Sequence, residues 1–121
     1  MVKLDHLTLF VRAVELSRDW YVNILALRVE FDVPAVRAVA LQDTDGFGLF
    51  LQERPVRDFA PSCVLTFQVD DVETKCRELA AMNIDLDSPP QKLPWGYGAE
   101  ITDPDGYVIR LWDKQSMREK G

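Results

Sequence analysis

Residues 3–11 alternate between two sides, with Leu7, Leu9 and Val11 on one side and Leu4, His6, Thr8 and Phe10 on the other. This two-residue period predicts a β-strand. Residues 14–25 instead place apolar side chains three and four positions apart, which indicates an amphipathic helix. Three short β-rich runs follow at 28–33, 36–43 and 46–53, the last two separated by an Asp-Thr-Asp-Gly turn. The first part of the chain therefore has the predicted order β-α-β-β-β.

The second part of the chain repeats the first. LTLFVRAVE at 7–15 matches LTFQVDDVE at 65–73, and DTDGFGLFLQE at 43–53 matches DPDGYVIRLWD at 103–113. Strands are predicted at 63–70, 98–103 and 107–113, a helix at 72–83, and a proline-broken edge strand at 84–95. The charged residues 117–121 are expected to fray.

Two such units cannot each bury a sheet face alone, so we expect one domain over residues 1–121. Repeat 1 spans about 1–57 and repeat 2 about 58–121, with the proline-containing residues 54–62 as connector. The predicted class is α+β, with a mixed, curved sheet and the helices outside.

Charge and composition exclude some partners. The chain has 14 basic and 20 acidic residues, a net charge of −6, and no basic run. Binding to nucleic acid or to an anionic membrane surface is therefore not expected. No apolar run approaches the length of a membrane span, and the first residues do not resemble a signal peptide. We expect a cytoplasmic protein in which Cys63 and Cys76 are free, buried thiols.

The repeated strands have two different faces. One is wholly apolar and is expected to pack under the helices. The other mixes aromatic, aliphatic and polar side chains, which is typical of a small-molecule pocket, although a half-solvated sheet face is the alternative. Trp95 and Tyr97 lie beside this face on a PWGYG segment, whose glycines favour a turned or mobile loop that would act as a lid.

The tandem order, together with DHLTLFV, VELSRDWYVNIL, LTFQVDDVETKCRELAAMNI and DPDGYVIRLWD, resembles the vicinal oxygen chelate superfamily. That superfamily contains glyoxalases, bleomycin-resistance proteins and extradiol dioxygenases. The resemblance covers nearly the whole chain. It implies a curved eight-stranded sheet around a cavity, and a homodimer.

In metal-dependent members of the superfamily, the resemblance implies ligands at four equivalent positions. In this chain those positions hold His6, Phe50, Val64 and Arg110. Phe50 and Val64 have no donor atom, and Arg110 is a cation that repels a metal. Only His6 can ligate, so we expect no metal cofactor.

The resulting hypothesis is a metal-independent small-molecule binding protein with a planar ligand. Arg110 either pairs with an acid such as Glu100 or holds an anionic group of the ligand. One alternative is a lyase, isomerase or dioxygenase with a rebuilt metal site, or with His6 in acid–base catalysis. The other is a regulatory, partner-binding module. No catalytic residue is otherwise expected, and the predicted ligand-binding residues are His6, Thr8, Phe10, Phe50, Gln52, Thr66, Gln68, Trp95, Tyr97, Arg110 and Trp112.

Overall fold

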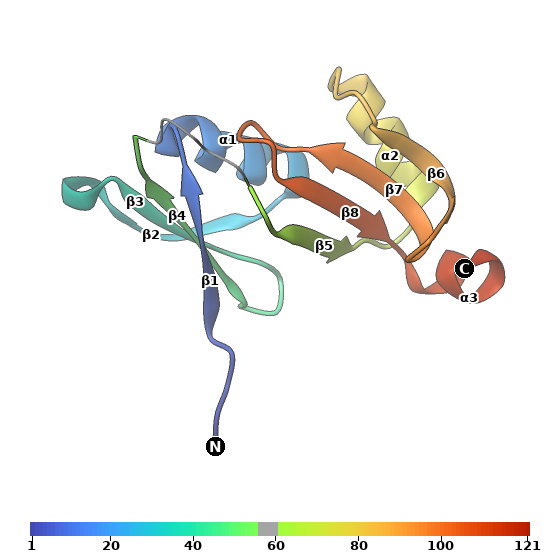
Figure 1. Cartoon of the computed structure of the whole chain (residues 1–121), viewed down its shortest axis with the longest axis horizontal. Coiled ribbons are helices and arrows are strands. Elements are labelled where there is room, and N and C mark those ends of the chain that lie inside the picture. The colour runs from blue at the N-terminus through green and yellow to red at the C-terminus, as the bar shows by residue number, and fades with distance from the viewer. Residues whose placement is uncertain (56–60) are drawn as a thin grey trace. The chain divides into compact units, whose positions relative to one another are not determined.

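The computed structural model describes residues 1–55 and 61–121. The chain divides into two compact units, Met1–Phe59 and Ala60–Gly121. Each unit contains a four-stranded sheet, and the strands and helices are labelled in Figure 1. The predicted repeat boundary near residue 57 lies outside the described residues.

The first unit has one parallel and two antiparallel strand pairs. Its strand order is β1-β4-β3-β2, in which β1 runs parallel to β4. The elements match the predicted β-α-β-β-β order, with a short 3₁₀ helix, η1, added before β3. They are β1 His6–Val11, α1 Val14–Leu25, β2 Arg28–Val33, η1 Pro34–Val36, β3 Ala38–Gln42 and β4 Gly48–Glu53.

The second unit repeats this arrangement, with strand order β5-β8-β7-β6 and β5 parallel to β8. The proline-containing β6 lies at the sheet edge, as predicted. Its elements are β5 Val64–Gln68, α2 Val72–Ala81, β6 Ser88–Leu93, β7 Gly96–Thr102, β8 Val108–Trp112 and α3 Lys114–Lys120.

The α+β class and the eight strands are thus confirmed, but the strands form two four-stranded mixed sheets rather than one hydrogen-bonded sheet. The expectation that residues 117–121 fray was wrong for residues 117–120, which belong to α3, and Gly121 caps the end of that helix. None of the described helices is long and apolar enough to cross a membrane.

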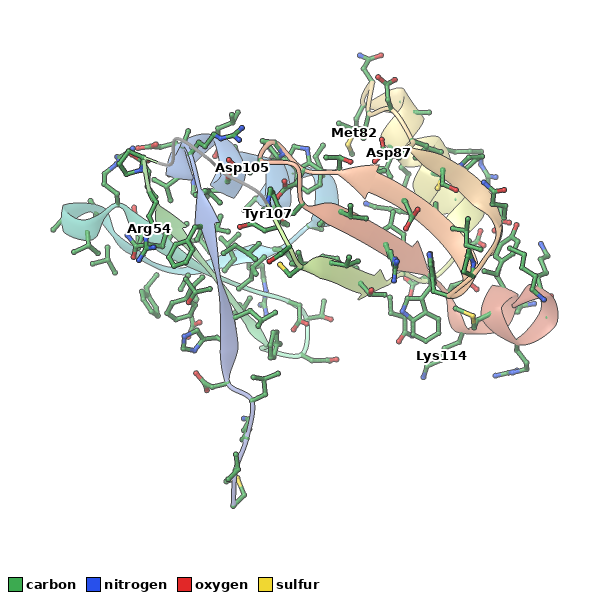
Figure 2. All side chains as sticks on the ribbon, in the orientation of Figure 1. Arg54, Met82, Asp87, Asp105, Tyr107 and Lys114 are labelled. Atoms are coloured by element: carbon green, nitrogen blue, oxygen red, sulfur yellow. The ribbon has the colours of Figure 1, made fainter. Side chains whose placement is uncertain are left out.

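The same turn precedes the last strand of each unit. The Asp43 carboxylate accepts the backbone N–H groups of Asp45 and Phe47, each at 2.9 Å. In the second unit Asp103 accepts those of Asp105 and Tyr107, at 2.9 and 2.8 Å. Asp105 and Tyr107 are labelled in Figure 2. Each turn ends in a glycine with positive φ, +85° at Gly46 and +93° at Gly106. This geometry explains why an Asp-x-Asp-Gly sequence appears twice.

An acid at the end of the last strand, or directly after it, also supports the first helix of each unit. Glu53 accepts the backbone N–H of Val14, the first residue of α1, at 2.9 Å. Asp113 accepts that of Val72, the first residue of α2, at 2.8 Å. The first N–H groups of a helix have no partner within the helix, so these acids satisfy a donor that would otherwise be unpaired.

The predicted apolar face forms much of the core. In the first unit Leu9, Val11, Leu49 and Leu51 are buried, while Leu7 is 44% exposed. Leu65, Ile109 and Leu111 are buried in the second unit. Both cysteines are free, but only Cys76 is buried, and the expectation of a buried Cys63 was wrong.

Candidate functional site

The polar and aromatic face of the first unit is centred on His6 and Phe50. Their rings stack, with centroids 4.1 Å apart and planes 21° apart. Phe31 of β2 meets the Phe50 ring edge-on at 5.6 Å. Gly48 leaves room for this cluster, because a Cβ atom there would lie 2.9 Å from His6 Cβ and 3.3 Å from Phe50 Cε1.

The imidazole of His6 is held from its other side by Asp5. The distance from His6 Nδ1 to Asp5 Oδ2 is 2.9 Å. A carboxylate can only accept a hydrogen bond, so Nδ1 carries the proton in this contact. The His6 side chain is 38% exposed, so the imidazole is partly accessible to solvent.

The neighbouring predicted residues of the first unit already have partners within it. The Arg54 guanidinium lies 3.8 Å from the centroid of the Phe10 ring. Gln52 Nε2 donates to the carbonyl of Val36 at 2.8 Å. Thr8 pairs in register with Phe50 and is exposed. By alternation along the paired strands β1 and β4, Thr8, Phe10 and Gln52 share the sheet face of His6.

In the second unit the central feature is an ion pair between facing strands. Glu100 on β7 and Arg110 on β8 are direct antiparallel partners in the register. Side chains at such positions are within reach of one another. Arg110 Nε lies 3.1 Å from Glu100 Oε2, and the side chains are 33% and 24% exposed. Of the two alternatives for Arg110, pairing with Glu100 is therefore the one observed.

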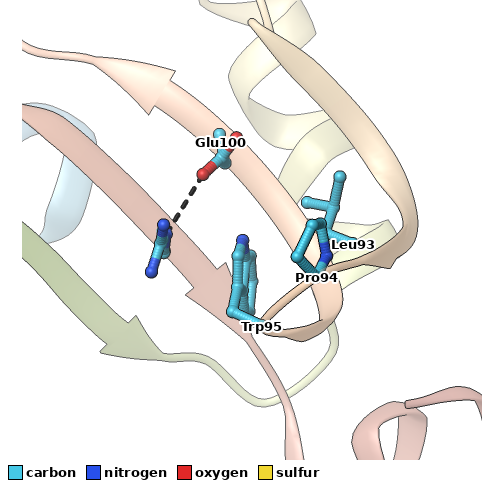
Figure 3. Close-up of a pocket in the computed structure, with 5 residues that line it drawn as sticks. Leu93, Pro94, Trp95 and Glu100 are labelled. Atoms are coloured by element: carbon cyan, nitrogen blue, oxygen red, sulfur yellow. Dashed lines mark hydrogen bonds and ion pairs between the residues drawn. The ribbon is translucent and has the colours of Figure 1, made fainter.

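Trp95 completes a hollow beside this ion pair. Pro94 and Trp95 form the turn between β6 and β7, and Arg110 Cζ lies 5.2 Å from the centroid of the indole. The hollow has a volume of about 330 Å³ and is the candidate ligand pocket (Figure 3). Its lining residues are Leu93, Pro94, Trp95, Glu100 and Arg110.

Tyr97 lies on the other face of β7, away from this pocket. Its hydroxyl donates to Glu73 of α2 at 2.8 Å, and that bond raises the pKa of Tyr97. Gly96 and Gly98 belong to β7, so the expectation of a glycine loop was wrong. Gly98 is needed for close packing, because a Cβ atom there would collide with the Trp95 ring and the Leu111 carbonyl.

The remaining predicted residues share the sheet face of Arg110 but do not line the pocket. Thr66 is the register partner of Arg110, and Gln68 is the partner of Trp112. Thr66 and Gln68 are exposed, and Trp112 is half-buried. The structure thus brings Trp95 together with Arg110 in the second unit, and His6 together with Phe50 in the first.

Sequence reasoning missed three residues of these two groups, Phe31, Leu93 and Pro94, and named Glu100 only as a possible partner of Arg110. The pairing of Glu100 with Arg110 had a weak signal in the sequence, because a cation on a pocket face needs an acid nearby. Phe31 had none, because a register shift in β2 between Val29 and Phe31 changes the side to which its residues point.

The residues at the four implied ligand positions do not fit a divalent metal. His6 supplies the one donor, its Nδ1 is held by Asp5, and Arg110 is paired with Glu100. Carboxylate oxygens of Asp71, Glu73 and Asp113 do lie within 4.8 Å of one another. Asp71 and Asp113 accept helix N–H groups and Glu73 accepts from Tyr97, so structural bonds account for this cluster.

The fold and the two side-chain groups define a class of protein: tandem βαβββ units with a small-molecule-sized hollow on an open sheet face. The chain belongs to the Glyoxalase/Bleomycin resistance protein/Dioxygenase superfamily, whose family model matches residues 3–111. No curated protein matches it.

Solved structures of similar fold include proteins with different descriptions. An antibiotic binding protein, TnmS3 from Streptomyces sp. CB03234, is 25% identical, with a TM-score of 0.77 over 93% of this chain and 96% of that one. TioX from Micromonospora sp. ML1 is 21% identical, with a TM-score of 0.70 over 91% and 97%. A lactoylglutathione lyase from Agrobacterium tumefaciens is 16% identical, with a TM-score of 0.72 over 93% and 94%.

Proposed function

We propose that this protein is a metal-independent small-molecule binding protein that holds a planar ligand against its aromatic side chains. The observation that supports this most is the state of the four implied metal positions. Phe50 stacks on His6, Val64 offers no donor, and Arg110 is bound to Glu100. The chain keeps the fold of the superfamily, but the side chains at three of the four positions cannot coordinate a metal.

The chemistry of the remaining side chains favours binding over catalysis. A metal would supply a Lewis acid to the reaction, and one histidine is not enough to hold it. The pocket at Trp95 has a volume of about 330 Å³, at the lower end of the range for small-molecule sites. TnmS3, the 25% identical protein, is described as an antibiotic binding protein.

Calorimetric titration with Zn²⁺, Ni²⁺ and Mn²⁺ tests the absence of a metal site. We expect no tight, stoichiometric binding to the wild-type chain. One tight site that His6→Ala abolishes would overturn the proposal. Asp71→Asn is the matched control, because it removes an acid of the Asp71, Glu73 and Asp113 cluster without touching His6.

Binding itself is tested by ligand-observed NMR with a panel of planar bicyclic compounds at several pH values. We expect saturable binding by part of the panel. A panel in which nothing binds would contradict the proposed function, whatever the metal titration shows.

A second candidate function is acid–base catalysis by His6. It is favoured by the Asp5–His6 hydrogen bond, which orients the imidazole through Nδ1, as an acid–base group requires. A turnover screen on thiohemiacetals of 2-oxoaldehydes tests it. Turnover that is lost in His6→Gln and reduced in Asp5→Asn would favour the enzyme over the binding protein.

A further inference from the structure

We infer that the pocket of the second unit selects an uncharged planar ligand with a hydrogen-bond acceptor and a donor on adjacent atoms, such as a lactam edge, over a carboxylate or phosphate. This inference rests on the proposed function and names the ligand class of its pocket. It follows from how Arg110 and Glu100 bind each other.

The ion pair leaves a donor and an acceptor side by side. Arg110 uses Nε, at 3.1 Å from Glu100 Oε2. Among the described residues, no hydrogen bond is made by the two terminal nitrogens of Arg110 or by Oε1 of Glu100. A guanidinium offers five N–H donors and an ionised carboxylate only accepts. Arg110 can therefore still donate hydrogen bonds to a ligand, and Glu100 can still accept one.

Strand register fixes the spacing of these two groups. Glu100 and Arg110 face each other directly across β7 and β8, so the exposed donor and acceptor belong to neighbouring side chains on one sheet face. A lactam presents a carbonyl and an N–H on adjacent ring atoms. The carbonyl would accept from Arg110 and the N–H would donate to Glu100.

The charge of the site disfavours an anion. Glu100 neutralises the cation that a ligand carboxylate would need, and a second carboxylate on the same guanidinium would be repelled by the first. An uncharged ligand is not repelled by Glu100 and can form hydrogen bonds with both Arg110 and Glu100. The Glu100–Arg110 ion pair thus argues against the alternative in which Arg110 holds an anionic group of the ligand.

The rest of the pocket supplies a wall for a flat ring. Leu93, Pro94 and the indole of Trp95 line the side beside the ion pair (Figure 3). These side chains offer apolar surface and no charge. A fused two-ring system therefore has an apolar wall for its rings and the ion pair for its polar edge.

Three matched probes test the inference by ligand-observed NMR titration: 2-quinolone, 1-methyl-2-quinolone and quinoline-2-carboxylate. The first has the complete lactam edge, the second lacks the N–H, and the third is an anion of similar size. In the wild-type protein we expect 2-quinolone to bind at least about tenfold more tightly than either of the others, since a good hydrogen bond to a charged group is worth that factor or more.

Glu100→Gln keeps the shape of the side chain and removes its charge. We expect this variant to bind quinoline-2-carboxylate about tenfold more tightly than the wild type does, and to lose most of the preference for 2-quinolone. If it fails to fold, as judged by circular dichroism, Glu100→Asp serves instead and should weaken 2-quinolone binding by lengthening the reach to the ligand.

Tighter binding of the carboxylate than of 2-quinolone in the wild type would overturn the inference and leave the proposed function standing. Equal binding of 2-quinolone and its N-methyl derivative would overturn it as well. Failure of every planar compound in the wider panel would overturn the proposed function together with the inference.

Discussion

At the scale of single residues, Gly98 has a clear packing role. It lies in β7 beneath the indole of Trp95, and a Cβ atom at this position would collide with Trp95 and with the carbonyl of Leu111. The Leu111 carbonyl belongs to the neighbouring strand β8 and cannot move without disturbing the sheet. Gly98 thus allows both the close approach of the strands and the position of Trp95 in the pocket.

Gly98→Ala should therefore destabilise the second unit and displace Trp95. We expect the free energy of unfolding to fall by about 1–3 kcal/mol, as for other insertions into packed regions. Urea denaturation measures this change, and tryptophan fluorescence, compared in a Trp20→Phe, Trp112→Phe background, reports the displacement of the Trp95 ring. Lys92→Ala, at an exposed position of β6, is the matched control. Equal stability of Gly98→Ala and the control would show that the packing is loose.

How far the site could be predicted also depends on single residues. Alternation along β1 and β4 was enough to place His6 and Phe50 on one face, and the repeat then located Arg110. The directions of Glu100 and Tyr97 were not predictable, because the start of β7 contains two glycines and gives no two-residue pattern. Tyr97 was assigned to a loop and is in fact a strand residue whose hydroxyl binds Glu73.

At the scale of elements, Asp113 links the ends of two helices. Its carboxylate accepts the backbone N–H of Val72 at 2.8 Å and that of Ser116 at 2.7 Å, so it serves the N-termini of α2 and α3. Burial acts to raise the pKa of Asp113, but these N–H bonds outweigh it and hold the pKa below its ordinary value.

A lowered pKa in the folded state means that Asp113 stabilises the protein when ionised. This contribution is complete above the pKa of an unfolded aspartate and is lost as the pH falls through the lower, folded pKa. We expect Asp113→Ala to cost about 1–2 kcal/mol at neutral pH, as for other helix-cap removals. The cost should shrink in strongly acidic solution. Urea denaturation from pH 7 down to pH 2 measures this, and a cost that does not change with pH would contradict it.

The helix α3 shows why an element can be missed from sequence. Isolated helices this short are marginal, so a charged run at the chain end was expected to fray. In the structure, contacts with β7 stabilise this short helix. Met117 Sδ lies 3.4 Å from the Tyr97 backbone nitrogen, and Met117 packs where Gly96 has no side chain. Met117 and Tyr97 are twenty residues apart in the chain, so this packing cannot be predicted from the sequence of the helix alone.

At the scale of the whole molecule, the internal repeat predicted most of the fold. Both units share the βαβββ order and the Asp-x-Asp-Gly turn, and in both an acid at the end of the last strand or directly after it, Glu53 or Asp113, accepts a helix N–H group. The division of the eight strands into two hydrogen-bonded sheets was not predictable, because strand alternation is a local property and does not define which strands pair. The family assignment needed only the repeated motifs, which is why it was available from the sequence.

The last prediction concerns self-association. The first unit exposes apolar side chains along β2 and η1: Val29 at 46%, Phe31 at 45%, Val33 at 38% and Val36 at 56%. Soluble proteins rarely leave such a group uncovered, and we expect a homodimer in which a second copy covers it. Light scattering should then give twice the chain mass of 13.8 kDa.

Val29→Lys combined with Val36→Lys should shift this dimer to the monomer, because the introduced charges would have to be buried without partners. Leu16→Lys is the matched control, since Leu16 is 59% exposed on α1, outside the β2 and η1 segment. If the wild type has the monomer mass at every concentration, the prediction is wrong. If Leu16→Lys dissociates the dimer as strongly as the double variant, a second copy does bind, but through the helix side of the unit, and β2 is then not the surface that it covers.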